Sequence, residues 1–358
     1  MSTKHYISDL FFNLFLRLFK NTIIKKKIFL NQNNKALLIH FGNKQQSLSI
    51  TPLLQIMKTS HQSSITILTT IKNAEVFENN PYVDEIVICK YQHKLFTVTL
   101  PELRKKRYDV VIDTHESINR RSAIILGMLN TNFKVGFLNG IESLLTHRLS
   151  ILNPNKTHVV DRYLCLAKVF EIYIDKSNLN LLYITLIKSQ RTIEDYVIKH
   201  DLQHKLTAVI NISNNFKLGF WGIDNYNRLL KYLRNYDINI IITSSIEDIE
   251  TAERIADNKH LIFYNTDFDI YAELIKNVNF VFSPDSFTIQ LASAYKIPVF
   301  CLFVQHKTAE MINVPYNSDF DFALTEQSDF RTISYGKVLN TFVPYFEYIY
   351  QRFKDNSL

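Results

Sequence analysis

The stretch VNFVFSPDSFTIQLASAYKIPVFCLF, residues 278–303, decides the fold of this chain. It predicts a buried strand at 280–283, a sharp turn at 284–286, a helix over about 288–295 and a second buried strand at 299–303. Continuous apolar strands on either side of a short helix are typical of a parallel sheet that is covered on both faces. We therefore expect a β-strand, α-helix, β-strand unit here.

The junction between the first strand and the helix of this unit carries Asp285, Ser286 and Thr288. In such units ligands lie outside the carboxyl ends of the strands, where the helix offers unpaired N–H groups and a partial positive charge. A simpler interpretation is that Asp285 or Ser286 only caps the helix. Both interpretations are open at this stage.

The same stretch resembles a motif of glycosyltransferase family 9, the heptosyltransferases of lipopolysaccharide core assembly. That family carries a strand, then D-[ST]-G-P-x-H-L-A-x-A, a small residue or two, then P-V and an apolar strand ending in Phe. The positions that agree with it are Asp285, Ser286, Leu291, Ala292, Ala294, Pro298, Val299 and Phe303. Phe287, Thr288 and Gln290 stand where the family has Gly, Pro and His. In the family the Gly lets the donor diphosphate approach the backbone and the His contacts phosphate.

The composition limits the class of protein. With 358 residues the chain is long enough for two domains. It has no G-x-G-x-x-G or G-x-x-x-x-G-K-[ST] motif, which argues against a dinucleotide dehydrogenase and a P-loop nucleotidase. Cys89, Cys165 and Cys301 lie in or beside apolar runs without metal-ligand spacing, so we expect buried thiols in a reducing compartment and no metal. A net charge of +7 without a nucleic-acid motif predicts an anionic membrane surface as partner, and no nucleic acid.

Residues 5–27 begin as an aromatic-rich helix in which Asp9, Asn13 and Arg17 recur every four positions. These residues form a narrow polar stripe beside a broad Leu and Phe face, in a segment too interrupted and too short to span a membrane. The basic cluster at 25–27 follows the apolar part, which is the reverse of a signal peptide. We expect residues 1–30 to be an amphipathic basic segment, either bound to anionic lipid or packed on the body of the protein.

Residues 35–41 predict a strand that leads into a loop and a helix, and the T-P-L-L run at 51–54 resembles family 9 at this position. Counting back from that run, His40 takes the place of the family's Arg. Gln46 takes the place of its Asp, which acts as general base in the family. An amide can hold a substrate hydroxyl but cannot accept its proton. The resemblance thus assigns Gln46 to the catalytic position and His40 and Asn43 to the acceptor side.

Residues 108–113, YDVVID, resemble the next family strand, and Asp113, His115 and Glu116 stand at its carboxyl end. A structural interpretation of the two acids is helix capping and pairing with the helix dipole. Our hypothesis is that His115 or Glu116 replaces the missing base, with Asp113 on the acceptor side. We treat His158, in a segment similar to H-x-[VI]-[DE]-[RK]-[YN], as structural.

The second half of the chain repeats the strand and helix pattern. By resemblance, a strand at 206–212 and the polar loop after it supply donor-binding residues, and Lys217 either reaches the donor phosphate or is a solvated loop residue. Glu247, after a strand at 238–242, either binds a ribose hydroxyl or begins the next helix. The expected donor-binding residues are Asn211, Ser213, Lys217, Thr243, Ser244, Glu247, Asp285, Ser286, Phe287, Thr288 and Gln290.

Apolar residues at helical spacing in 338–353 predict a last helix, which Pro344 is expected to kink or to start late. The expected organisation is the basic segment at 1–30, an acceptor-side domain at 31–175, a donor-binding domain at 186–335 and a helix at 336–358 that packs back on the first domain, as in family 9. Two doubly wound α/β domains facing a central cleft form the architecture called GT-B.

The resemblance covers nearly all of residues 36–353 and implies inverting, metal-independent transfer of heptose or a related sugar. The donor would be a nucleotide sugar, typically ADP-heptose, acting as co-substrate without any cofactor. The acceptor would be the lipopolysaccharide core or another lipid-linked molecule, at the cytoplasmic face of the inner membrane. Two other hypotheses are open: a family member that has lost catalysis and acts as a membrane-associated scaffold, and a nucleotide-sugar epimerase of the same architecture.

Overall fold

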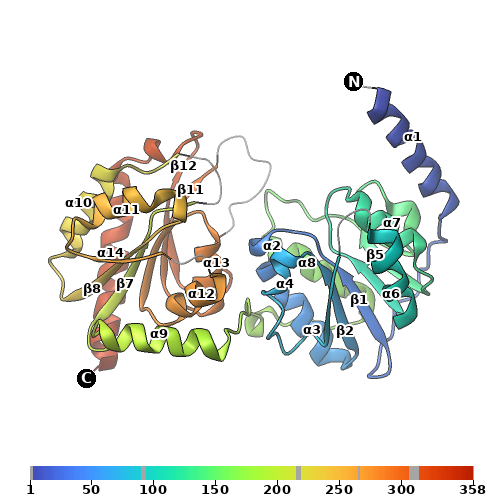
Figure 1. The fold of residues 1–358 in the computed structure, drawn as a ribbon, viewed down its shortest axis with the longest axis horizontal. Helices are drawn as coiled ribbons and strands as arrows, with labels where there is room; N and C mark the ends of the chain where they lie inside the picture. The colour runs from blue at the N-terminus through green and yellow to red at the C-terminus, as the bar shows by residue number, and fades with distance from the viewer. Residues whose placement is uncertain (1–2, 90–93, 215–218, 265–266, 306–313, 358) are drawn as a thin grey trace. The chain divides into compact units, whose positions relative to one another are not determined.

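The computed structural model describes residues 3–89, 94–214, 219–264, 267–305 and 314–357. The chain divides into two compact units, Met1–Leu179 and Asn180–Leu358. The division falls within 176–185, the stretch left between the two predicted domains. Each unit is a sheet with helices on both of its faces (Figure 1).

Unit 1 is built on a parallel sheet. Its described residues form six strands in the order β3-β2-β1-β4-β5-β6, and every neighbouring pair is parallel. The two central strands are apolar and almost wholly buried, as expected for a sheet covered on both faces. The strands are β1 (Lys35–Ile39), β2 (Ser64–Thr69), β3 (Glu85–Ile88), β4 (Val110–Asp113), β5 (Phe133–Phe137) and β6 (His147–Leu149).

Helices cover both faces of this sheet. On one face α6 (Leu100–Lys106) and α7 (Arg120–Met128) share a core with the strands, and α1 (Thr3–Leu18) packs on its edge. Pro101 lies in the first turn of α6, where its missing N–H costs no hydrogen bond. The helices of the other face are α2 (Lys44–Ser49), α3 (Thr51–His61), α4 (Ile71–Ala74) and α8 (Val159–Leu164) (Figure 1).

Unit 2 repeats this design. Its described residues form a parallel sheet of six strands in the order β12-β11-β10-β7-β8-β9. The predicted unit at 278–303 is confirmed, because β10 and β11 pair in parallel on either side of α13 (Phe287–Ala294). The strands are β7 (Leu206–Asn211), β8 (Ile238–Thr243), β9 (Leu261–Phe263), β10 (Phe280–Pro284), β11 (Val299–Val304) and β12 (Phe320–Thr325).

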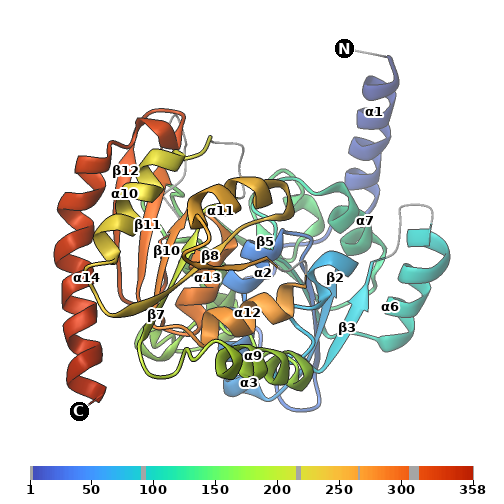
Figure 2. The same cartoon turned by 60° about the vertical axis from the view of Figure 1, so that its left-hand side comes forward.

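The helices of unit 2 divide between the faces of its sheet. One face is covered by α10 (Ile223–Leu233), α11 (Ile249–Ala256) and α14 (Tyr335–Ser357), whose buried residues share one core with the strands. The other helices, α9 (Ile187–Lys199), α12 (Phe268–Lys276) and α13, pack on one another on the opposite side, as Figure 2 shows.

Helix α14 differs from the prediction in two ways. It begins at Tyr335 and runs through Pro344, so the predicted late start is wrong. Its buried stripe lies in the core of unit 2, with ring centroids of Phe342 and Phe300 5.2 Å apart, which corrects the expectation that this helix packs back on the first domain. Aromatic pairs of this kind contribute about 1 kcal/mol each beyond their burial, and several of them offset the hydrogen bond that a proline cannot donate.

Two further predictions can be compared with the structure. Cys89, Cys165 and Cys301 are buried free thiols, as expected. Within the described ranges, none of the helices combines the length and the apolar character needed to cross a bilayer.

Candidate functional site

The strand order of each sheet changes direction at one point. From β1 the chain proceeds outward to β2 and β3, and then returns to β4 on the other side of β1. In unit 2 the same change separates β7 from β10. Loops that leave such a pair of strands diverge and make room for a ligand at the carboxyl edge. The residues that end or follow these four strands are therefore the first candidates for a site.

At the end of β4, Asp113 and His115 form a pair. His115 Nδ1 lies 2.5 Å from Asp113 Oδ1, and His115 Nε2 accepts the backbone N–H of Phe41 at 3.2 Å. Because Nε2 is an acceptor, the hydrogen of the neutral ring lies on Nδ1 and is donated to the carboxylate. Asp113 is 1% exposed, whereas His115 is partly exposed. A buried carboxylate thus holds one tautomer of a more accessible imidazole, an arrangement that suits a proton acceptor.

His40 follows β1 and is buried beside this pair. Thr114 Oγ1 donates to Ile39 O at 2.9 Å and so accepts from His40 Nδ1 at 2.8 Å. This leaves His40 Nε2 as an acceptor, buried and without a hydrogen-bond partner in the part of the chain that the structure describes. Burial, with the charge of His115 second, lowers the pKa of His40 to about 3. His40 is therefore a neutral residue, with its ring centroid 6.4 Å from that of His115.

Gln46 and Asn43 are engaged at the start of α2. Asn43 Oδ1 accepts the Gln46 N–H at 2.9 Å, and Gln46 Oε1 accepts the Asn43 N–H at 3.0 Å, which together form a reciprocal capping box. A Cβ on Gly42 would lie 2.6 Å from Gln46 Oε1 and 2.8 Å from His40 Nε2. The two predicted site residues therefore have a structural role here, and Gln46 lies close to His40.

Glu116 forms an ion pair with a buried arginine. Arg162 Nε donates to its two carboxylate oxygens at 2.8 and 3.0 Å, and Arg162 Nη1 donates to Thr157 O at 3.2 Å. The side chain of Arg162 is 5% exposed and that of Glu116 is 21% exposed. Protonation of Glu116 would leave the buried guanidinium without its counter-charge. The geometry therefore favours His115 over Glu116 as the replacement base.

Several residues that hold this site were not found from the sequence. The Phe41 ring lies 5.6 Å from the His115 ring, and Asn139 Nδ2 donates to the His115 carbonyl at 2.7 Å. Thr114 fixes His40, and Arg162 engages Glu116. Each of these residues belongs to a different segment, so the sequence carried no shared signal for them. His158, treated as structural, caps α8 by accepting the Val160 N–H at 3.2 Å.

In unit 2 the corresponding point holds a buried cluster of neutral groups. Asn211 ends β7 and is 4% exposed. Its Nδ2 donates to Ser213 O at 2.8 Å, to Ser283 Oγ at 2.9 Å and to Ser286 Oγ at 3.2 Å. The hydroxyl oxygens of Ser283 and Ser286 are 2.9 Å apart. Asn211 and Ser286, both predicted, thus belong to one buried cluster with Ser283, a polar residue inside an otherwise apolar strand.

A second set of hydrogen bonds joins β8 to α13. Tyr271 OH lies 3.3 Å from Thr243 Oγ1 and 3.0 Å from Thr288 Oγ1. Thr243 Oγ1 also donates to Asn211 Oδ1 at 3.5 Å. Burial raises the pKa of Tyr271, so its hydroxyl keeps its proton. Thr243 and Thr288 are therefore connected through a tyrosine that sequence reasoning missed.

The loop after β8 meets the loop after β7. Ser213 Oγ donates to Asp248 Oδ2 and accepts the Ser245 N–H at 2.8 Å. The hydroxyl of Ser244 is buried with no hydrogen-bond partner among the described residues. Glu247 is exposed in the turn before α11 rather than in its first turn, and hydrogen bonds from its own backbone and from Ser245 lower its pKa.

Among the described residues, the N-cap residue of helix α13 makes no side-chain hydrogen bond to the first turn. Ser286 occupies the N-cap position, but its hydroxyl bonds to Asn211 and Ser283 and makes no hydrogen bond to the first turn. The interpretation that Ser286 only caps this helix is therefore wrong. The N–H groups of an uncapped first turn, together with the helix dipole, favour an anion. Asp285 directly precedes this turn, and its backbone N–H donates to Leu302 O at 2.9 Å.

Two further predicted donor residues, Phe287 and Gln290, belong to the same helix. The Phe287 ring packs 5.4 Å from that of Phe268 and 5.7 Å from that of Tyr271, on α12. Gln290 is 1% exposed within α13. Lys217 lies outside the described residues.

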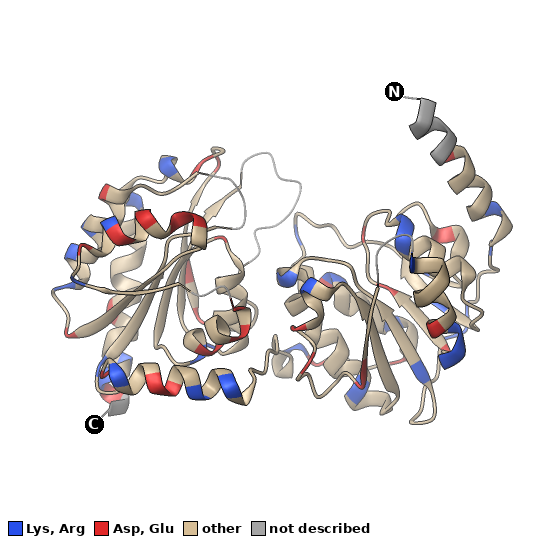
Figure 3. Ribbon diagram, in the orientation of Figure 1, with Lys and Arg blue, Asp and Glu red and all other residues tan. Residues whose placement is uncertain are grey.

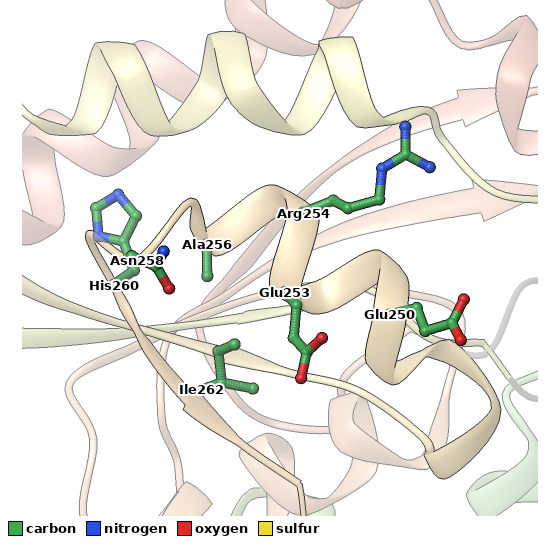
Figure 4. Close-up of a pocket in the computed structure, with 7 residues that line it drawn as sticks. All are labelled: Glu250, Glu253, Arg254, Ala256, Asn258, His260 and Ile262. Atoms are coloured by element: carbon green, nitrogen blue, oxygen red, sulfur yellow. The ribbon is translucent and has the colours of Figure 1, made fainter.

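A surface hollow of about 520 Å³ lies beside α11 and β9, away from these strand ends. The charged side chains of α11 and the His260 ring point in different directions rather than toward one point (Figure 4). None of the predicted site residues lines it, so we do not assign the site to this hollow. Its lining residues are Glu250, Glu253, Arg254, Ala256, Asn258, His260 and Ile262.

Comparison with known proteins agrees with the fold and the motifs. A family model described as glycosyltransferase family 9 (heptosyltransferase) matches residues 99–337. A curated relative from Escherichia coli K12, named "Putative lipopolysaccharide heptosyltransferase 4", is 25% identical over 315 residues, 86% of this chain and 85% of the relative.

Solved structures show the same fold at low sequence identity. The glycosyl transferase family 9 structure from Veillonella parvula DSM 2008 is 15% identical with a TM-score of 0.77, covering 89% of this chain and 98% of that one. The structure of the Escherichia coli heptosyltransferase WaaC with ADP is 15% identical with a TM-score of 0.67, and the match covers 88% of this chain and 99% of that one.

Two doubly wound α/β units with polar groups at their strand ends define a protein of the GT-B class. The family model spans more than half of the chain. The chain therefore belongs to glycosyltransferase family 9, the heptosyltransferase family, and is a glycosyltransferase.

Proposed function

We propose that this chain transfers heptose or a related sugar from a nucleotide donor, of the ADP-heptose type, to the lipopolysaccharide core or another lipid-linked acceptor. The observation that carries this proposal is the family match over residues 99–337. A structural relative whose name includes bound ADP supports the choice of donor. The transfer inverts the anomeric centre and uses no metal and no cofactor beyond the nucleotide sugar.

Unit 2 binds the donor in this proposal. The uncapped start of α13 supplies backbone N–H groups for the diphosphate, and the Asn211, Ser283 and Ser286 cluster fixes the turn that presents them. Asp285 orients the donor, since it stands directly before these N–H groups. The backbone N–H groups of α13 also stabilise the charge that develops on the departing diphosphate.

Unit 1 accepts the proton in this proposal, with His115 as the base. The acceptor hydroxyl gives its proton to His115 Nε2 while its oxygen forms a bond to the anomeric carbon. The bond from that carbon to the diphosphate oxygen breaks, and the electron pair leaves with the nucleoside diphosphate. Asp113 holds the tautomer whose Nε2 is the acceptor. The acceptor hydroxyl has to displace the Phe41 N–H that this nitrogen now accepts.

Titration calorimetry with ADP and ADP-heptose, followed by an assay for sugar transfer to detergent-solubilised inner-core lipid, tests this function. We expect binding of both ligands and inner-core lipid that gains one sugar. Asp285→Ala is expected to abolish donor binding, while Asp195→Ala on the exposed side of α9 keeps it. Wild-type affinity in Asp285→Ala would refute the role of Asp285.

A second candidate function is a family member that binds its ligands without turnover and serves as a scaffold. The observation that favours it is the engagement of Gln46 in the α2 cap, where it can neither move freely nor take a proton. Nucleotide binding without any transfer, in the presence of several lipid-linked acceptors, would favour this candidate. Measurable turnover excludes it.

We also propose that the reaction takes place at an anionic membrane surface on the cytoplasmic face of the inner membrane. A lipid-linked acceptor is presented at such a surface, and the net charge of +7 attracts the chain to it. Fractionation of cells that express the chain tests this location, because a salt-extractable membrane fraction is expected.

A further inference from the structure

Helix α1 has one broad apolar surface, and only one side of it is packed. Phe12, Phe15 and Leu16 pack against the core of unit 1. The Phe15 ring lies so close to Gly127 that any side chain at 127 would overlap it. Arg120 adds an ion pair with Asp9, and its guanidinium lies 5.1 Å from the Phe12 ring centroid. These contacts fix which side of α1 faces the protein.

The other side of this apolar surface is the exposed apolar face. Its residues recur at helical spacing, and a soluble surface seldom carries so many large apolar groups together. Their exposed fractions are 62% for Leu10, 68% for Phe11, 51% for Leu14 and 72% for Leu18.

The segment after α1 is attached to the body of unit 1 along its length. Backbone hydrogen bonds run from Asn21 N–H to Ser143 O at 2.8 Å and from Ile24 N–H to Thr146 O at 2.9 Å. The carbonyl of Lys26 lies 2.8 Å from His147 Nε2. This backbone is therefore held in place, so the exposed side chains of this segment cannot fold away from solvent.

Basic residues lie next to the exposed apolar face. Figure 3 shows a mostly neutral α1 with basic positions at its end and in the segment beyond it. Arg17, Lys20 and the three lysines at 25–27 are all exposed. Lys27 forms an ion pair with Glu171 at 3.8 Å, and no ion pair is recorded within the described ranges for the other four. A cluster of this sign beside an apolar face is complementary to anionic lipid.

We propose that α1 and the segment 19–29 form a docking surface for an anionic phospholipid bilayer. Leu10, Phe11, Leu14 and Leu18 enter the boundary between headgroups and acyl chains, while Lys25 and Lys26 contact lipid phosphates. A second copy of this chain fits the same surface less well, because both copies carry a net charge of +7. This docking does not rest on the proposed sugar transfer.

Co-sedimentation with phospholipid vesicles tests this surface with the full-length chain. We expect binding to vesicles of phosphatidylglycerol and phosphatidylcholine, weakened by salt, and little binding to phosphatidylcholine alone. Lys25→Gln with Lys26→Gln is expected to lower the affinity roughly 25-fold, from about 1 kcal/mol per basic residue near an anionic surface. Leu14→Ser with Leu18→Ser is expected to lower it at least as much.

A matched control is Ile198→Ser with Lys199→Gln, which changes an exposed apolar residue and an exposed lysine on α9 of unit 2. This variant should bind vesicles like the wild type. Equal binding by wild type and both α1 variants, or no binding by the wild type, would overturn the proposal. A dimer in light scattering that the leucine variants dissociate would also overturn it, in favour of a second copy of the chain. Calorimetry with ADP on the same preparations separates a failure of docking from a failure of the proposed function.

Discussion

The places where the strand order reverses differ in chemistry between the two units, although the two sheets have the same topology. In unit 1 this place carries groups that ionise, whereas in unit 2 the buried cluster at this place consists of amide and hydroxyl groups that stay neutral, with Asp285 next to it in the chain. The ionisable groups are His40, Asp113, His115, Glu116 and Arg162. The neutral groups are Asn211, Thr243, Tyr271, Ser283, Ser286 and Thr288.

This difference suggests how one fold serves two tasks. A group that takes a proton from a substrate has to change its charge, and an imidazole held by a carboxylate can do so. A site for a diphosphate needs hydrogen-bond donors whose charge stays the same, and hydroxyl and backbone N–H groups meet that need. Substitutions in unit 1 should therefore change turnover or the pH dependence of stability. Substitutions in the buried cluster of unit 2 should change stability equally at every pH.

The largest effect is expected for His115→Ala. Loss of the proposed base should lower sugar-transfer turnover by roughly 10²–10⁴-fold, while the ADP affinity from calorimetry stays the same because the proposed donor site belongs to unit 2. Asp113→Asn should lower turnover as well, since it removes the acceptor that holds the tautomer. His204→Ala, at a side chain that is 76% exposed, is the control. Unchanged turnover in His115→Ala would end the assignment of this base.

Glu116→Gln should lower stability without removing turnover. It leaves the guanidinium of Arg162 without its counter-charge, and the free energy of unfolding should fall by about 3 kcal/mol. Urea unfolding measures this change, with Glu194→Gln on the exposed side of α9 as control. If the variant were as stable as wild type but inactive, Glu116 and not His115 would be the base.

Acid should weaken unit 1 through His40. The pKa of His40 is lowered from 6.5 to about 3 in the folded chain, chiefly by burial. Between about pH 3 and pH 6.5 the unfolded chain therefore binds a proton on His40 that the folded chain does not bind. Stability from the neutral ring is therefore present above pH 6.5 and is lost as the pH falls, by about 2 kcal/mol at pH 5. The stability difference between wild type and His40→Gln, from urea unfolding, should shift by that amount between pH 7 and pH 5. An equal difference at both pH values would contradict a buried neutral His40.

Asn211→Ala should destabilise unit 2 in a way that does not depend on pH. The hydroxyls of Ser283 and Ser286 each lose a buried hydrogen-bond donor, at a cost of about 1–3 kcal/mol. No group of this cluster titrates near neutral pH, so the loss should be the same at pH 5 and pH 7. Thr192→Ala on the exposed side of α9 is the control. A loss that changed with pH would break the contrast between the two units.

The smallest effect is expected for Gly42→Ala, between His40 and Gln46. The added methyl overlaps Gln46 Oε1 and His40 Nε2, and the free energy of unfolding should fall by about 1 kcal/mol. Gly336→Ala in α14 is the matched control, because nothing lies within 4 Å of its Cβ. That variant should keep or slightly raise stability. Equal effects of the two substitutions would show that the Gly42 turn is less crowded than its neighbours indicate.

Most of the fold could be predicted from the sequence, because burial periodicity and turn chemistry are local properties. The predicted strands at 238–242 and 299–303 lie within β8 and β11. The last helix was the main error. Pro344 indicated a late start, but aromatic packing on the second sheet carries the helix through it.

The candidate site was predictable only in part. The carboxyl ends of the strands marked Asp113, His115, Asn211 and Ser286 correctly as polar groups at an edge of a sheet. The spacing of Asn43 and Gln46 fits a capping box, but the same amide could equally have faced a substrate, so only the structure decided that Gln46 caps its own helix.

By itself, the sequence determined which polar residues follow each buried strand, since hydropathy and strand length are written along the chain. Only the tertiary structure decided which of these residues act together. His40 and Thr114 are 74 positions apart, and Glu116 and Arg162 are 46 apart. A hydrogen bond forms only when donor and acceptor come within about 3 Å, and only strand order and packing bring such distant residues that close.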